Sequence, residues 1–192
     1  MISETWKKAV IEGSMILIGV LVALFVDSWR EDVEFQSIVT ATENNIVEEI
    51  VGNRERLESY RAEFTSRREQ LEIWASAIDV NLGILYQMDS FPGIPNTFMN
   101  RSAWTMANNS QITEYIDHEF YDIAFELYAT GEAMEDRLDI VLSVLFDVRG
   151  FNSEFTIPLA EVLKLYFNDI ISNIDAQIRD HDEFITKFEL GT

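Results

Sequence analysis

The stretch WKKAVIEGSMILIGVLVALFVDSW, residues 6–29, decides the fold that we expect of this chain. It contains an apolar run of 18 residues, Ala9 to Val26, in which Glu12 is the only charged residue. As an α-helix, such a run spans about 27 Å, close to the hydrocarbon thickness of a bilayer. Trp6 and Trp29 bracket the run, as aromatic residues do at the two interfaces of a membrane.

The charges on either side of the run predict its orientation. Lys7 and Lys8 precede it, whereas the residues after it are mostly acidic: Glu31, Asp32 and Glu34 beside Arg30. By the positive-inside rule, we expect residues 1–8 to be cytoplasmic, residues 9–28 to form a transmembrane signal-anchor helix in a bacterial inner membrane, and residues 29–192 to be periplasmic. Trp6, Lys7, Lys8 and Trp29 are the predicted membrane-interface anchors.

Two other interpretations of the run stay open at this point. A cleaved signal peptide has the same order of charged and then apolar residues, although residues 22–27, VALFVD, lack a small-x-small cleavage site. A buried core helix of a soluble protein is the other alternative, because such a helix is also apolar all round.

The presence of Glu12 within the apolar run has two interpretations. It lies one turn after Lys8, so it could pair with that lysine or reach the headgroups. Alternatively, Glu12, Gly19 and Ala23 fall within about 40° of each other on a helical wheel. Gly19 and Ala23 form a small-xxx-small pair that permits close helix approach, and an acid beside it indicates a partner helix that satisfies the carboxylate.

The composition bounds the fold and the partners of the downstream part. The net charge of −20 lies almost wholly after residue 32, and such a surface repels nucleic acid and anionic lipid. The negative charge is consistent with a role in solubility, or with binding of a cation or a basic soluble protein partner. The chain has 3 prolines and 8 glycines, which favours long helices, and no cysteine, which excludes disulfides and thiolate sites.

A repeat of seven residues predicts a long helix after the apolar run. The repeat consists of Ile50, Leu57, Phe64, Leu71 and Ile78. The adjoining series consists of Ile46, Asn53, Tyr60, Arg67 and Trp74, in which Asn53 and Arg67 are polar interruptions. This pattern predicts one helix from Val33 onward, packed along a bundle or coiled coil. It could continue the membrane helix as one rod, with or without a kink near Asp27–Asp32.

Turn signals divide the remaining chain. Residues 88–98, MDSFPGIPNTF, and residues 149–156, RGFNSEFT, are predicted loops. We predict a short helix at Arg101–Asn108 and a long one from about Tyr115–Asp117 to Val148, with Gly131 as a tolerated break or bend. Thr156 is the predicted N-cap of a third long helix that runs to about Glu189. The expected fold is all-α: an N-terminal transmembrane helix followed by an antiparallel bundle of long helices.

Motifs for catalysis are few. His118 and His181 are the only histidines, and neither has the context of a nucleophile elbow or the Glu-x-x-His spacing of a di-iron bundle. We predict no catalytic residue, no cofactor and no metal site. The pair Glu114 and His118, or the sequence RDHDE at residues 179–183, could hold an adventitious divalent cation as the remaining alternative.

The sequence EGSMILIGVLVALFVDSW resembles the N-terminal signature of a large group of bacterial single-pass membrane proteins of unknown function. The matching residues are Glu12, Ile18, Gly19, Val20, Leu21, Ala23, Leu24, Asp27 and Trp29. The segments NIVEEIVGNRERL, residues 45–57, and SAWTMANNSQITEYIDHEFYDIAFELY, residues 102–128, are similar to the later helices of that group. The resemblance implies a membrane-anchored helical domain and no particular activity. It also adds Asp27 to the residues expected to contact a partner helix.

From these features we expect a non-catalytic accessory or structural subunit that docks on a larger integral membrane complex. The predicted contact residues are Glu12, Gly19, Ala23 and Asp27, and the bundle would brace the complex outside the membrane. A respiratory or photosynthetic complex is one such setting. The alternative is a periplasmic ligand-sensing domain that signals through a partner protein.

Overall fold

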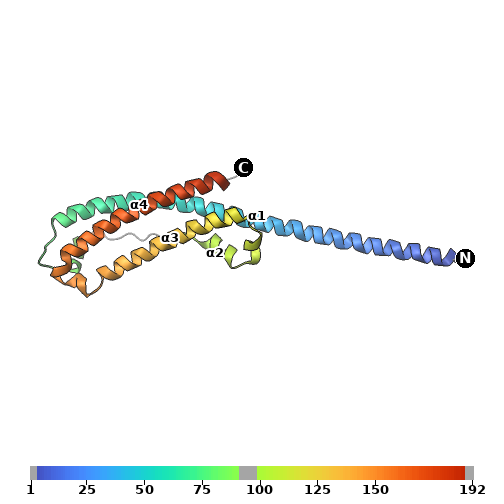
Figure 1. The fold of residues 1–192 in the computed structure, drawn as a ribbon, viewed down its shortest axis with the longest axis horizontal. Coiled ribbons are helices and arrows are strands. Elements are labelled where there is room, and N and C mark those ends of the chain that lie inside the picture. The colour runs from blue at the N-terminus through green and yellow to red at the C-terminus, as the bar shows by residue number, and fades with distance from the viewer. Residues whose placement is uncertain (1–3, 91–98, 189–192) are drawn as a thin grey trace. The chain divides into compact units, whose positions relative to one another are not determined.

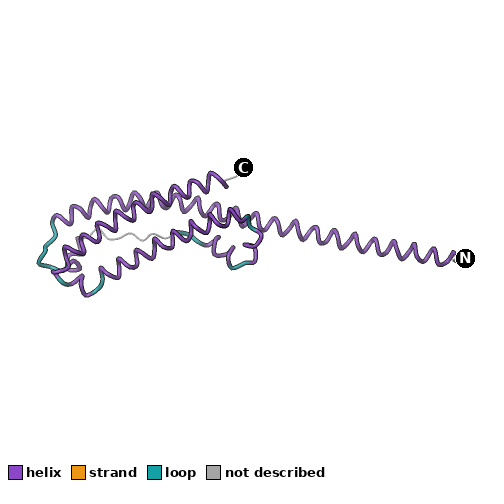
Figure 2. Tube along the Cα trace, viewed as in Figure 1, coloured by secondary structure: helices purple, strands orange, loops and turns teal. Residues whose placement is uncertain are grey.

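The computed structural model describes residues 4–90 and 99–188, and the regular elements in these ranges are all helices (Figure 2). The α-helices are α1 (Glu4–Ser76), α2 (Ser102–Asn108), α3 (His118–Leu145) and α4 (Thr156–Phe188). The short 3-10 helices are η1 (Ile84–Ser90), η2 (Gln111–Tyr115), η3 (Val148–Phe151) and η4 (Ser153–Phe155). The predicted all-α fold, a long apolar N-terminal helix followed by a bundle, is confirmed.

The chain forms two compact units, which we describe separately. The N-terminal unit is Met1–Asn44 and the bundle is Asn45–Thr192. In the N-terminal unit, residues 12–34 are all exposed, and the large apolar side chains from Met15 to Val26 are 51–72% exposed. Among the described residues, α1 is the one helix that is long and apolar enough to cross a membrane. The most apolar 18-residue window of this helix is 0% buried.

The bundle consists of the C-terminal part of α1 together with α3 and α4. The chain returns from the end of α1 before α3 begins, so α1 and α3 run in the same direction and α4 runs antiparallel to both (Figure 1). Ion pairs between exposed side chains follow this arrangement: Arg61 of α1 pairs with Asp175 of α4, and Lys187 of α4 pairs with Glu119 of α3.

The core lies where the apolar stripes of the three long helices meet. The seven-residue repeat of α1 forms its first wall, since Ile50, Leu57, Phe64 and Leu71 are each 0–1% exposed. Phe167 of α4 packs on Phe64 with ring centroids 5.8 Å apart. Burying a side chain of this size stabilises the folded state by roughly 1.5–3 kcal/mol, so the stripe is the main reason that α1 holds the other helices.

The end of α1 differs from the expectation drawn from the repeat. The helix ends at Ser76, so Ile78 lies in the following turn, although it still packs against the core. The Ser76 hydroxyl donates to the Ile73 carbonyl at 2.7 Å, and the Ala77 N–H donates to the Trp74 carbonyl at 3.0 Å. These bonds to carbonyls three residues back tighten the last turn and end the helix.

Several predicted boundaries also need correction. Of the predicted loop at residues 88–98, the first three residues complete η1, and residues 91–98 lie outside the described residues. The second long helix begins at His118, with Asp117 as its N-cap, and ends at Leu145 rather than Val148. The third ends at Phe188, while Glu189 lies outside the described residues.

Thr156 and Gly131 have roles other than those predicted. Thr156 has helical backbone angles (φ −59°, ψ −51°), so it is not an N-cap. Its hydroxyl donates to the Leu82 carbonyl at 2.6 Å and ties the start of α4 to the turn after α1. Gly131 does not interrupt α3, which runs unbroken from His118 to Leu145. It lies against the Met99 side chain, and an added Cβ would overlap Met99 Sδ.

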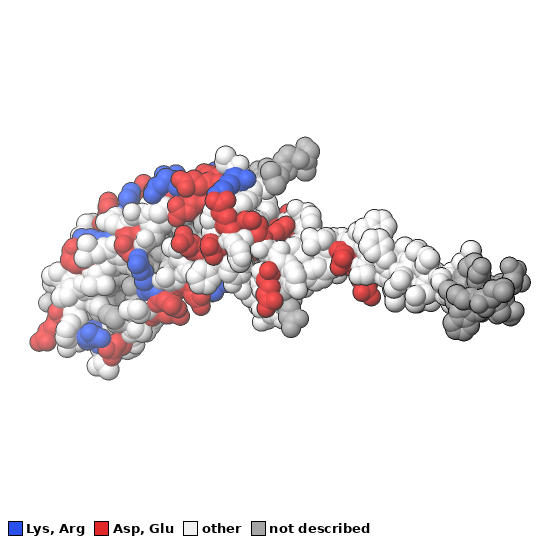
Figure 3. Space-filling view, turned by 45° about the vertical axis from the view of Figure 1, so that its right-hand side comes forward, with Lys and Arg blue, Asp and Glu red and all other residues white. Residues whose placement is uncertain are grey.

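The charged side chains lie mainly on the bundle. In Figure 3, acidic groups with some basic groups among them cover the visible face of the bundle, whereas the described part of the N-terminal unit is largely uncharged. This separation matches the sequence, in which the apolar run precedes almost all of the negative charge.

Candidate functional site

The predicted partner-helix contact lies on the exposed surface of α1. Glu12, Gly19, Ala23 and Asp27 are all exposed. A Cβ added to Gly19 would have no heavy atom within 4 Å, apart from its own helix backbone and neighbours. None of the four predicted contact residues is buried by another described residue.

A shallow hollow marks the same face. It is lined by Val20, Ala23, Leu24, Val26, Asp27 and Arg30. The small side chain of Ala23 leaves this space, while Asp27 and Arg30 supply polar groups at its C-terminal end. Close packing of helices in a membrane uses small residues in this way, because they allow the two backbones to approach.

The predicted membrane-interface anchors are only partly placed by the structure. Trp29 is 62% exposed on α1. Trp6, Lys7 and Lys8 belong to α1 by their backbone, but their side chains lie outside the described residues. The predicted pair between Glu12 and Lys8 is therefore untested.

The bundle contains a buried polar junction that the sequence reasoning missed. Glu49 of α1 is 8% exposed, and its carboxylate accepts hydrogen bonds from the Ala103 N–H at 2.9 Å and the Trp104 N–H at 3.3 Å. The Tyr128 hydroxyl of α3 donates to the same carboxylate at 2.8 Å. Arg101, at the N-cap position of α2, makes no side-chain cap. Glu49 therefore caps α2 from another helix and joins it to α3.

Asn53 lies one turn further along α1 and continues this junction. It is 1% exposed, and its side-chain amide exchanges two hydrogen bonds of 2.8 Å with the backbone of Asn100. Glu135 of α3 holds the same segment by accepting from Arg101 at 2.6 Å and from the Met99 N–H at 3.1 Å. Asn53, one of the two polar residues that interrupt the apolar series, thus attaches the segment before α2 to α1.

An aromatic cluster covers the junction. The Trp104 ring stacks on Tyr128 with centroids 4.9 Å apart and packs on Tyr121 at 5.2 Å. Burial raises the pKa of Tyr128, and the hydrogen bond to the Glu49 carboxylate adds to this effect. The tyrosine therefore stays neutral and remains a hydrogen-bond donor to the Glu49 carboxylate.

A sequence signal for this junction does exist. On the helical wheel of α1, Glu49 lies about 40° from Asn53 and about 60° from Ile46, which places it at the edge of the buried stripe. The two later segments that carry the family resemblance, residues 45–57 and 102–128, supply Glu49, Asn53, Trp104 and Tyr128, so they meet here.

The two histidines lie in different surroundings. His118 is the exposed first residue of α3. His181 is 0% exposed, and its Nδ1 lies 2.7 Å from the Gln177 carbonyl, while Asp180, Asp182 and Glu183 beside it are exposed. Within the described residues, no group of three or more His, Cys, Asp or Glu side chains could hold a metal ion.

Comparison of the chain with protein-family models, with curated proteins and with solved structures found no match. The resemblance to single-pass membrane proteins therefore remains a prediction from the sequence motif.

The first prediction concerns Glu49. We expect Glu49→Ala to lower the free energy of unfolding of the bundle by about 2–3 kcal/mol, because it leaves two N–H groups and one hydroxyl without their acceptor. Chemical denaturation of the full chain in neutral detergent, followed by circular dichroism, measures this. The matched control is Glu48→Ala, since Glu48 is exposed. Equal stability of the two variants would contradict the role of Glu49.

The second prediction concerns His181. Burial lowers the pKa of His181, an effect that Arg54 adds to, while the Gln177 carbonyl, Asp180 and Asp182 oppose it. The unfolded chain therefore binds a proton near pH 6.5 that the folded chain does not bind. We expect stability to be constant above about pH 7 and to fall below pH 6.5 by up to about 1.4 kcal/mol per pH unit. Denaturation midpoints between pH 5 and 8 should lose this slope in His181→Leu and keep it in His118→Ala.

Proposed function

We propose that the protein is a non-catalytic accessory subunit, anchored in a bacterial inner membrane by the apolar part of α1, which docks on a larger integral membrane complex. The observation that carries the proposal is the complete exposure of residues 12–34, in which residues 13–26 form an uncharged, largely apolar helical surface with Glu12 and small residues on one face.

The energetic cost of this exposed surface in water supports a membrane. An exposed large apolar side chain forgoes about 1.5–3 kcal/mol relative to a buried one, and Met15 to Val26 contains ten of them, interrupted by Gly19 and Ala23. Soluble monomers rarely expose apolar patches larger than a few hundred Å². The core-helix alternative receives no support, because the most apolar window is 0% buried.

The orientation follows from the charges. Lys7 and Lys8 would hold the N-terminal end of the span in the cytoplasm, and the acidic bundle would lie in the periplasm. There it would brace the partner complex, for example a respiratory or photosynthetic one, or present its acidic surface to a basic soluble protein.

The contact with the complex is assigned to the face of Glu12, Gly19, Ala23 and Asp27. A carboxylate within the apolar part of a membrane helix is expensive unless a partner supplies a hydrogen bond or an opposite charge. Gly19, Ala23 and the hollow beside Ala23 would let that partner helix approach closely enough to do so. The alternative function, a periplasmic ligand-sensing domain that signals through a partner, is favoured by a cleft between α3 and α4.

The third prediction tests the orientation. The chain has no cysteine, so single cysteines report the side of the membrane without background labelling. In intact spheroplasts, a membrane-impermeant maleimide should label Glu72→Cys on the bundle and should label Ser3→Cys only after permeabilisation. The reverse pattern, or labelling of both before permeabilisation, would contradict the proposed topology.

The fourth prediction tests docking. The full chain, tagged and purified from its native host in a gentle neutral detergent, should carry an integral membrane protein with it. The double variant Glu12→Leu with Gly19→Ile should lose this protein, because it removes the acid and fills the groove.

The control is Gly13→Ile with Ser14→Leu, which enlarges two small residues of the same helix away from the face of Glu12 and Gly19. It should retain the partner. A wild-type chain that purifies alone, or a partner that survives the Glu12 and Gly19 changes, would show that this face is not a docking surface.

A further inference from the structure

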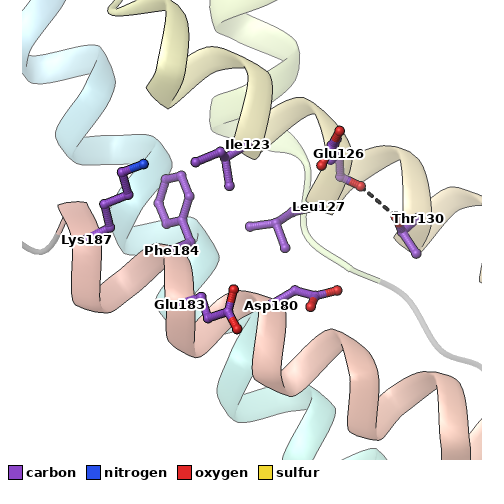
Figure 4. A pocket seen from close by; sticks show the side chains of 8 residues that line it. All are labelled: Ile123, Glu126, Leu127, Thr130, Asp180, Glu183, Phe184 and Lys187. Atoms are coloured by element: carbon purple, nitrogen blue, oxygen red, sulfur yellow. Dashed lines mark hydrogen bonds between the residues drawn. The ribbon is translucent and has the colours of Figure 1, made fainter.

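A cleft between α3 and α4 has an apolar floor. It encloses about 340 Å³, within the size range of ligand pockets (Figure 4). Leu127 of α3 and Phe184 of α4 are buried beneath it, and Ile123 is half-buried at one end. This floor suits an aliphatic chain.

The rim of the cleft is acidic. Glu126, Asp180 and Glu183 line it, and all three are exposed and form no ion pair among the described residues. Lys187 is the one cation in the lining, and it already pairs with Glu119. The cleft therefore offers three carboxylates to a cationic ligand, and it repels anions.

An unsatisfied amide lies in a small cavity next to the cleft. Thr130 borders both the cleft and an adjoining cavity of about 40 Å³, which is also lined by Gln177. Gln177 is 1% exposed, yet neither its Oε1 nor its Nε2 has a hydrogen-bond partner in the described structure. Arg137 lines the same cavity, but its guanidinium lies 3.3 Å from Asp169, which offsets its charge. Buried polar groups in native proteins are rarely left unpaired, so this amide indicates a polar occupant of the cavity.

We propose that the α3–α4 cleft binds a linear alkyl polyamine. The methylene chain would lie on Leu127 and Phe184, and ammonium groups would pair with Asp180 and Glu183. A terminal ammonium would reach the adjoining cavity, which Thr130 and Gln177 line, and donate to Gln177 Oε1. A compact divalent cation does not fit the apolar floor, and the described residues offer no cluster of three ligating groups.

This proposal is independent of docking through the membrane helix, since the cleft belongs wholly to the bundle. It adds a small-molecule ligand to the accessory subunit, and it would supply the stimulus if the bundle serves as a sensor.

The fifth prediction is tested by titration calorimetry of the full chain in neutral detergent with spermidine. We expect saturable binding of one spermidine per chain. The double variant Asp180→Asn with Glu183→Gln should weaken binding roughly tenfold, as expected for two partly screened ion pairs. Ile123→Trp, which fills the cleft without changing charge, should also weaken it. Gln177→Met should weaken binding without lowering the melting temperature, because it replaces an unpaired amide with an apolar chain of similar size.

The matched control is Glu132→Gln with Asp139→Asn, which removes the same charge from exposed positions of α3 that do not line the cleft. Binding should change by less than about twofold. An equal loss in the control would show attraction to a diffuse acidic surface and would overturn the proposal. So would binding of Mg²⁺ with the same dependence on the variants, or binding of an oligolysine peptide in the cleft without binding of spermidine.

Discussion

The buried stripe of α1, from Ile46 to Trp74, is the surface on which the rest of the bundle depends. Its large apolar side chains face α3 and α4 together, because a repeat of seven residues keeps one side of a helix in register over several turns. Removing this surface would leave the two amphipathic helices α3 and α4 and the short helical elements with no common core. The same helix is apolar all round between residues 13 and 26, where no core forms, so one element presents two kinds of apolar surface.

Polar groups within the stripe decide where the smaller elements attach. A purely apolar stripe would allow α2 and the segment before it to slide along α1, since hydrophobic packing is not directional. Glu49 and Asn53 remove that freedom, because each accepts or donates hydrogen bonds with fixed geometry to the backbone of residues 100–104. Tyr128 then extends the connection to α3. The junction trades some apolar burial for a defined position.

The unsatisfied groups contrast with this junction. The buried acceptors of Glu49 and Asn53 have partners, whereas the Gln177 amide and His181 Nε2 have none among the described residues. Both lie on α4, one turn apart, and neither lines the cleft itself. Glu49 and Asn53 of α1 thus have their hydrogen-bond partners within the fold, whereas Gln177 of α4 has none among the described residues, so Gln177 is where a ligand would add hydrogen bonds.

The sequence by itself determined the helical class, the apolar helix, the buried stripe and the approximate positions of the helices. These features depend on periodicity and on local turn chemistry, which lie within a few residues of one another in the chain. The sequence also indicated Glu12, Gly19 and Ala23, because their common face follows from helix geometry alone, whereas Asp27 was added by the resemblance to single-pass membrane proteins.

Only the tertiary structure decided the parallel course of α1 and α3, the use of Thr156 as a tertiary donor, the contact of Gly131 with Met99, and the roles of Glu49 and Gln177. Each of these involves residues that are distant in the chain. Their contacts depend on how side chains of different helices pack, and a local sequence pattern does not specify this packing.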